Sequence, residues 1–273
     1  MSATQHKAVT EYVVSRDGTR IAYEASGHGP ALILVDGAFC YREFGPMRKL
    51  AALLAGNFRV ICYDRRARGE SGDTPPYSME RELEDIDALL GVAGGHAHLY
   101  GISSGAALAL AAAATRFPID RVALYEPPFM VGPHARRNLP SETERHTMLT
   151  RLLEADRRGD AVKYYMCDVI GMPRLMASVF QFLPMWKKLK SVARSLPYDS
   201  TIMGNFALPQ ERTAQIKVPT LVMHGSKTWP VLGDAARATA TALPVGQHRT
   251  LAGQTHNVSA SALAPVLQEF FRS

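Results

Sequence analysis

The stretch HAHLYGISSGAALALAAAATRF, residues 96–117, decides the fold class of this chain. Its first six residues predict a buried strand, and the small apolar residues that follow predict a helix. Between them, Gly101, Ser103 and Gly105 form the pattern G-x-S-x-G, which places a serine on a tight turn from a strand into a helix. The two glycines allow close approach of the neighbouring backbone, and the helix N-terminus behind Ser103 supplies positive potential. The stretch therefore predicts a nucleophilic serine at the end of a strand.

Strands and helices alternate on both sides of this stretch. YVVSRDGTRIAYEASG (12–27) predicts a hairpin around Asp17-Gly18, because two strand-like runs flank an Asp-Gly turn. Apolar runs predict further strands, several of them buried on both faces as in a parallel sheet. These runs are ALILVDG (31–37), FRVICYD (58–64), RVALYEPPF (121–129), PTLVMHG (219–225) and HRTLAG (248–253). Apolar residues at helical spacing predict helices over 44–55, 78–94, 233–244 and 262–271.

The segment 130–210 differs from the rest of the chain. It has helical periodicity, many Arg and Lys residues, and prolines that interrupt helices without strands between them. Strand–helix alternation on both sides of one helical block predicts an α/β fold, with a mostly parallel, doubly wound sheet and an inserted helical cap. The predicted core is 1–129 and 211–273, and the predicted cap (or lid) is 130–210. In such sheets ligands bind beyond the carboxyl ends of the strands.

The composition is that of an ordinary globular protein, with 47% hydrophobic and 21% charged residues among 273. No run of about 18 apolar residues exists, so we expect no membrane partner. The opening MSATQHKAVTEY lacks an apolar signal segment, so we expect a cytoplasmic location. Cys40, Cys62 and Cys167 are odd in number and lack metal-ligand spacing, so we expect free thiols and no metal site.

The net charge of +6 raises the question of a nucleic-acid partner. The basic residues are scattered, however, in RRAR (65–68), ARR (135–137) and KKLK (187–190). The first group falls in a predicted loop and the other two in predicted helices, and no aromatic residues interleave with them. We therefore expect a basic surface and no nucleic-acid binding.

A nucleophilic serine needs a general base, and His256 has the most suitable position. It lies in GQTHN (253–257), a loop between the last predicted strand and the last predicted helix, from which an imidazole can reach the strand ends. His96, His98 and His224 lie on predicted strands, and we expect structural roles for them. His256 is therefore the predicted base.

The histidine in turn needs an orienting acid, and RVALYEPPF ends on a carboxylate. Glu126 closes the strand that follows the helix of the serine, so it lies on a neighbouring strand at the same edge of the sheet. The cost of its burial would be offset by a charge-assisted hydrogen bond to His256. Asp234 and Asp36 remain as alternatives. Asp234 falls at a predicted helix N-terminus, where its charge favours the helix, and Asp36 can order its own loop through side-chain to backbone bonds.

An oxyanion hole is expected beside the serine. One donor is the backbone N–H of Ser104, whose hydroxyl is in turn placed to cap the helix. The second donor is a backbone N–H of the loop after ALILVDG, that of Gly37 or Ala38.

The chain resembles the α/β-hydrolase superfamily over essentially its whole length. The resemblance lies in ALILVDG, YDRRARGESG (63–72), YGISSGAA (100–107), the cap insertion, PTLVMHG and GQTHN. In the usual layout of that superfamily the acid follows the strand that is PTLVMHG here, but Lys227, Thr228 and Trp229 occupy this place. The strand-end glutamate is similar to that of zearalenone-type lactone hydrolases. This resemblance implies a triad of Ser103, His256 and Glu126, with Gly37 or Ala38 and Ser104 at the oxyanion hole.

The predicted function is hydrolysis of a carboxylic ester or lactone through an acyl-enzyme, without a metal or organic cofactor. The substrate is expected to be a small molecule with a bulky apolar part, because methionines and aromatics are frequent in the cap. The predicted lining consists of Phe129, Met166, Met172, Phe180, Phe182, Met185, Trp186 and Trp229, although simple packing of cap helices explains each one equally well. The alternative function is cofactor-free, non-hydrolytic chemistry on the same fold, of a lyase, cyclase or haloperoxidase-like kind. A monomer and a homodimer are both compatible with the sequence.

Overall fold

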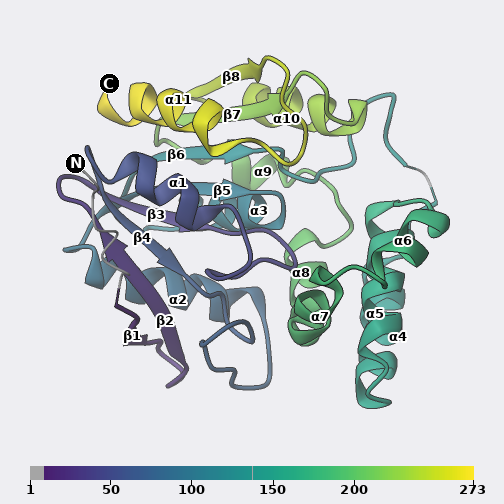
Figure 1. The fold of residues 1–273 in the computed structure, drawn as a ribbon. Helices are drawn as coiled ribbons and strands as arrows, with labels where there is room; N and C mark the ends of the chain where they lie inside the picture. The colour runs from purple at the N-terminus through teal and green to yellow at the C-terminus, as the bar shows by residue number, and fades with distance from the viewer. Residues whose placement is uncertain (1–8, 137) are drawn as a thin grey trace, which may run out of the picture.

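The computed structural model describes residues 9–136 and 138–273 and contains one eight-stranded sheet with helices on both faces (Figure 1). The strands lie in the order β1-β2-β4-β3-β5-β6-β7-β8. β1 pairs with β2, and β2 with β4, in antiparallel fashion, and all remaining pairs are parallel. Their bounds are β1 Glu11–Val14, β2 Arg20–Ser26, β3 Ala31–Val35, β4 Arg59–Tyr63, β5 Ala97–Ile102, β6 Ile119–Tyr125, β7 Thr220–Gly225 and β8 Gly246–Leu251. The predicted α/β fold with a mostly parallel, doubly wound sheet is confirmed.

Two apolar layers sandwich the sheet because successive strand residues point to opposite faces. In β3, Ile33 and Val35 belong to one cluster, whereas Leu32 and Leu34 belong to the other. The first layer is covered by α2 (Met79–Val92), α3 (Ser104–Ala113) and α10 (Pro230–Ala242), and the second by α1 (Met47–Leu54) and α11 (Ala260–Arg272).

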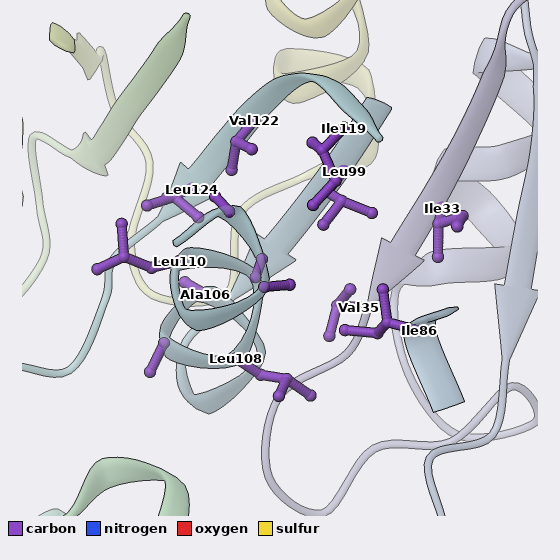
Figure 2. Packing of buried hydrophobic residues seen from close by; sticks show 14 of the residues in the cluster. Ile33, Val35, Ile86, Leu99, Ala106, Leu108, Leu110, Ile119, Val122 and Leu124 are labelled. Carbon is purple, nitrogen blue, oxygen red and sulfur yellow. The ribbon is translucent and has the colours of Figure 1, made fainter. Parts of the chain in front are cut away.

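Helix α3 is made of small residues because it packs directly on the middle of the sheet. Nine of its ten residues are buried, so it has no polar face. Figure 2 shows Leu110 of α3 beside Leu124 of β6, and Val35 of β3 near Ile86 of α2. This burial on all sides fixes the turn that precedes α3, and with it Ser103.

Helices α4–α8, between β6 and β7, form a block around their own apolar cluster, whereas α9 lies outside this block, beside α10 (Figure 1). The bounds of these elements are α4 (Glu142–Glu154), α5 (Arg158–Tyr164), the π-helix Tyr165–Ile170, α6 (Arg174–Phe180), α7 (Met185–Ser191), the short 3₁₀ helix Ala193–Ser195, α8 (Leu196–Met203) and α9 (Gln210–Thr213). We refer to α4–α8 as the cap helices. Phe39, from the loop after β3, joins their cluster and stacks edge-on against Tyr165.

The structure corrects three expectations about local structure. Helix α10 begins at Pro230 rather than at residue 233, so Asp234 lies inside the helix and not at its N-terminus. Ala135 and Arg136 lie in irregular structure after a turn at Pro133 and His134 and not in a helix, and Arg137 lies outside the described residues. The arginines of RRAR are in the predicted loop, but Arg65, Arg66 and Arg68 are buried and add nothing to a basic surface.

Within the described residues, α2 is the longest helix at 14 residues, shorter than the roughly 20 that a helix needs to cross a bilayer. Cys40, Cys62 and Cys167 are free thiols.

Candidate active site

Ser103 sits on a sharp turn between β5 and α3. Its φ of 55° is in the left-handed region, which is strained for a residue with a side chain. Its N–H still donates to the carbonyl of Tyr125 (3.0 Å), so the strand ladder ends at this residue. A Cβ on Gly101 would collide with the carbonyl of Gly105, and one on Gly105 with the carbonyl of Val35. Both glycines of G-x-S-x-G are therefore required by close backbone approach.

Glu126 follows β6 and is fully buried. Its φ of 48° is also in the left-handed region, and its N–H donates to the carbonyl of Met223 (2.9 Å). Its carboxylate accepts the N–H of Gly225 (Oε1, 2.8 Å) and the hydroxyl of Thr228 (Oε2, 3.0 Å). Polar groups from the end of β7 and the loop after it therefore compensate for the burial of this carboxylate.

His256 completes this arrangement, with its Nδ1 2.6 Å from Oε2 of Glu126. This bond fixes the orientation of the ring and leaves Nε2 as the nitrogen that can accept a proton. The indole of Trp229 stacks on the imidazole at a centroid distance of 6.2 Å and an angle of 19°. The hydroxyl of Tyr125 donates to the carbonyl of Thr255 (2.6 Å) and holds the loop just before His256. The structure thus brings Glu126 and His256 together.

The two alternative acids have other partners. Asp234 binds Nδ1 of His134 (2.6 Å) and Arg237 (2.7 Å) on the surface of α10. Asp36 is buried, and its Oδ1 accepts the N–H of Gly37 (3.2 Å), as expected for a residue that orders its own loop. Burial raises the pKa of Asp36 to about 7.

The loop expected to donate to an oxyanion lies directly against the serine. A Cβ on Gly37 would lie 3.2 Å from Cβ of Ser103 and 3.1 Å from the carbonyl of Ile102. Because the N–H of Gly37 is used by the carboxylate of Asp36, the N–H of Ala38 is the better placed of the two candidate donors. Ser104 is the first residue of α3, so helix geometry leaves its N–H without an intrahelical partner.

The hydroxyl of Ser104 does not cap its helix, contrary to expectation. It donates to Oδ1 of Asp199 in α8 (2.7 Å), and both residues are fully buried. Arg65 and Arg68 bind the same carboxylate. The sequence analysis does not identify this cluster, because it assigns RRAR to a basic surface. Glu82, which follows RRAR in the next predicted helix and pairs with Arg65, is the available signal in the sequence.

The predicted lining residues differ in burial and in position. Phe129 is buried against the sheet, and Met166 is buried in the cap cluster. Met172, Phe180, Met185 and Trp186 are partly buried in that same cluster, where they pack the cap helices together. Phe182 is 83% exposed. Trp229 is half exposed and contacts His256, so it is the member of the set that lies beside the predicted triad.

The described residues include side chains that are possible ligands of a metal ion. Among the described residues, no group of three or more His, Cys, Asp or Glu side chains is arranged to hold a metal ion. The chemistry that the arrangement can perform is nucleophilic, with a serine at a strained turn and a histidine held by a buried carboxylate.

Comparison with known proteins agrees with the fold. The model of the alpha/beta hydrolase family matches residues 15–268, and the chain belongs to this family. The crystal structure of an alpha/beta hydrolase from Sphaerobacter thermophilus DSM 20745 is 46% identical, with a TM-score of 0.89 over 96% of this chain and 100% of that chain. The esterase RhEst1 from Rhodococcus sp. ECU1013 is 20% identical, with a TM-score of 0.67 over 97% of this chain and 98% of that chain, and is similar in fold.

One curated relative matches a smaller part of this chain. The probable oxidoreductase EphD of Mycobacterium bovis (strain ATCC BAA-935 / AF2122/97) is 36% identical over 100 residues. This match includes 33% of this chain and 16% of the length of that relative. It therefore gives no basis for transferring the activity of the whole relative.

Proposed function

We propose that this protein is a serine hydrolase that cleaves a carboxylic ester or lactone, with Ser103 as nucleophile, His256 as general base and Glu126 as orienting acid. The observation that carries the proposal is the 2.6 Å contact between Nδ1 of His256 and Oε2 of Glu126, on the strand next to that of Ser103. Three polar partners offset the cost of burying the Glu126 carboxylate, and one of them is the imidazole of His256, whose side chain is 33% exposed and therefore accessible from solvent.

The proposed reaction has two steps. His256 takes the proton of Ser103 as the serine attacks the substrate carbonyl, and the resulting oxyanion accepts hydrogen bonds from the N–H groups of Ala38 and Ser104. His256 then protonates the leaving alkoxide, which gives an acyl-enzyme. A water molecule, activated by the same imidazole, releases the acid and restores Ser103.

The place of the acid supports a lactone as one class of substrate, since the glutamate after β6 is the feature that resembles zearalenone-type lactone hydrolases. Trp229 offers an exposed apolar surface next to His256, where an apolar part of the substrate can lie.

The test compares hydrolysis of a short-chain aryl ester and a macrocyclic lactone by the wild type and three variants. Ser103→Ala and Glu126→Gln should lower kcat by about 10³-fold or more, because the triad acts as a unit. Asp234→Asn is the matched control, since it also removes a carboxylate that binds a histidine, and it should retain activity. If Asp234→Asn is the damaged variant, Glu126 is not the acid. If the wild type cleaves neither substrate, cofactor-free non-hydrolytic chemistry becomes the better proposal.

A further inference from the structure

A fully buried carboxylate from the cap helices reaches the core beside the predicted nucleophile. Asp199 of α8 accepts the hydroxyl of Ser104 at Oδ1 (2.7 Å). It also accepts Nη1 of Arg65 at Oδ1 (2.9 Å) and Nη2 of Arg68 at Oδ2 (2.7 Å). All four side chains are buried, so these bonds are not weakened by solvent.

The same two arginines hold the loop that carries the predicted oxyanion donor. Arg68 Nη1 donates to the carbonyl of Gly37 (2.6 Å) and more weakly to that of Cys40 (3.2 Å). Arg65 Nη1 donates to the carbonyl of Asp36 (3.2 Å). The carbonyl of Gly37 and the N–H of Ala38 belong to one planar trans peptide and point in opposite directions. Arg68 therefore sets the direction of the Ala38 N–H by binding the other side of the same peptide group.

Charge balance indicates that Asp199 keeps Arg68 in place. Arg65 pairs with Glu82 through Nε (2.6 Å) and Nη2 (2.7 Å), whereas Arg68 has Asp199 as its carboxylate partner. Burial by itself would raise the pKa of Asp199, but Arg68 and Arg65 hold it below its usual value, so the carboxylate is charged. Without that charge, Arg68 would be a buried cation with carbonyl partners but no hydrogen-bonded carboxylate, and it would have to move or admit water.

We propose that Asp199 is a positioning residue that couples the cap helices to the oxyanion hole. It fixes Ser104 directly, and it fixes the Gly37–Ala38 peptide through Arg68. Both predicted oxyanion donors thus depend on one carboxylate that belongs to the cap and touches no substrate. This inference rests on the proposed function, because it assigns the two donors to that reaction.

The chain provides a matched control in the next arginine of the same loop. Arg66 binds Asp85 of α2 through Nε (2.8 Å) and Nη2 (2.7 Å), and both residues are buried. This pair resembles the Arg68–Asp199 pair in burial and has two hydrogen bonds where that pair has one. The further partners of Arg66 are Asp17 and the carbonyl of Arg81, away from the Gly37 loop. Asp85→Asn therefore measures the cost of a broken buried ion pair by itself.

The experiment measures kcat, KM and thermal midpoint for Asp199→Asn, Ser104→Ala and Asp85→Asn, at a temperature where each variant is folded. We expect Asp199→Asn to lower kcat by about 10- to 100-fold and to change KM by less than threefold. The reason is that the N–H of Ala38 would still be present but would no longer point toward the oxyanion. Ser104→Ala deletes one hydroxyl and keeps the backbone N–H, so a smaller loss in kcat is expected. It also keeps the proposal testable if Asp199→Asn fails to fold. Asp85→Asn should lose stability without a matching loss in kcat.

Equal losses of kcat in Asp199→Asn and Asp85→Asn, in proportion to their stability losses, would overturn the proposal. Amide hydrogen exchange over residues 36–40 gives a second readout that does not require turnover. Faster exchange in Asp199→Asn than in Asp85→Asn supports the link from the cap to the loop, and equal exchange rejects it. If Ser103→Ala leaves hydrolysis unchanged while this difference in exchange is present, the proposed function fails but the link remains.

Discussion

Ser103 and Glu126 occupy equivalent places at the ends of neighbouring parallel strands. Each follows its strand directly, each has a positive φ (55° and 48°), and each N–H continues the ladder to the next strand. The same turn thus points a serine and a glutamate away from two adjacent strands at one edge of the sheet. Strain at both residues is tolerated because the packed sheet on either side fixes their backbone.

The bond from Thr228 to Glu126 gives a first prediction. Thr228→Val keeps the shape of the side chain but removes one of the three polar partners of the carboxylate. With one bond fewer, the carboxylate holds His256 less firmly, and we expect kcat/KM to fall by about tenfold in steady-state hydrolysis. Thr241→Val removes a similar hydroxyl bond on the exposed side of α10 and should leave kcat/KM unchanged. Unchanged activity in Thr228→Val would mean that this bond serves stability alone.

Gly225 gives a second prediction, because the loop of His256 lies directly on it. A Cβ at this position would collide with the carbonyl of Gln254 and lie 2.7 Å from the hydroxyl of Tyr125. Gly225→Ala should therefore displace the loop, weaken the Gly225–Glu126 bond and cost about 2 kcal/mol of the free energy of unfolding, together with most of the activity. Denaturant unfolding and hydrolysis rates measure both effects.

The control is Gly91, a glycine inside α2 with nothing within 4 Å of an added Cβ. Gly91→Ala should stabilise the protein by about 0.5–1 kcal/mol, since alanine favours a helix over glycine. Destabilisation by both substitutions to a similar extent would argue against the close contact at Gly225.

The residues of the predicted site show why part of it could be predicted from the sequence and part could not. Gly101, Ser103 and Gly105 are adjacent in the chain, so their local pattern contains the geometry of the turn. The strand that ends at Tyr125 was predictable because its apolar residues and Pro127 mark its end. The contact between Ser104 and Asp199 spans 95 residues and depends on how the cap packs, which no local pattern encodes. The burial of Arg65 and Arg68 follows from the same packing, and it reverses the meaning of an apparently surface-exposed basic run.

Asp36 gives a third prediction, on the pH dependence of stability. Burial raises its pKa from 3.8 to about 7, so the folded state binds this proton more tightly than the unfolded state. The contribution of Asp36 to the free energy of unfolding therefore falls as the pH rises from about 4 to about 7, by roughly 4 kcal/mol at 1.36 kcal/mol per pKa unit. Asp36→Asn keeps an oxygen for the N–H of Gly37 and removes the titration.

The difference in unfolding free energy between Asp36→Asn and the wild type should therefore grow in favour of the variant as the pH rises. It should be small near pH 4 and reach a plateau above pH 7, as measured by urea unfolding across this range. A difference that is independent of pH would show that Asp36 does not titrate in this interval. Titrating groups that both proteins share contribute equally to the two free energies of unfolding, so their contributions cancel in the difference.

Tyr125 gives the last prediction, because its hydroxyl joins the core to the loop of the predicted base. It donates to the carbonyl of Thr255, the residue before His256, over 2.6 Å. Tyr125→Phe removes this bond and leaves the ring packed in the core, so we expect about 1 kcal/mol of lost stability. Activity should fall several-fold, since the loop would move more and His256 would be held only by its bond to Glu126 and its contact with Trp229. Tyr63 is a matched control, as its hydroxyl is buried without a hydrogen-bond partner in the described structure. Tyr63→Phe should be neutral or stabilising and keep full activity, because it removes a polar group that gains nothing from burial. Equal activity in the two variants would mean that Glu126 suffices to position the imidazole, and that the bond from Tyr125 to Thr255 contributes to stability only.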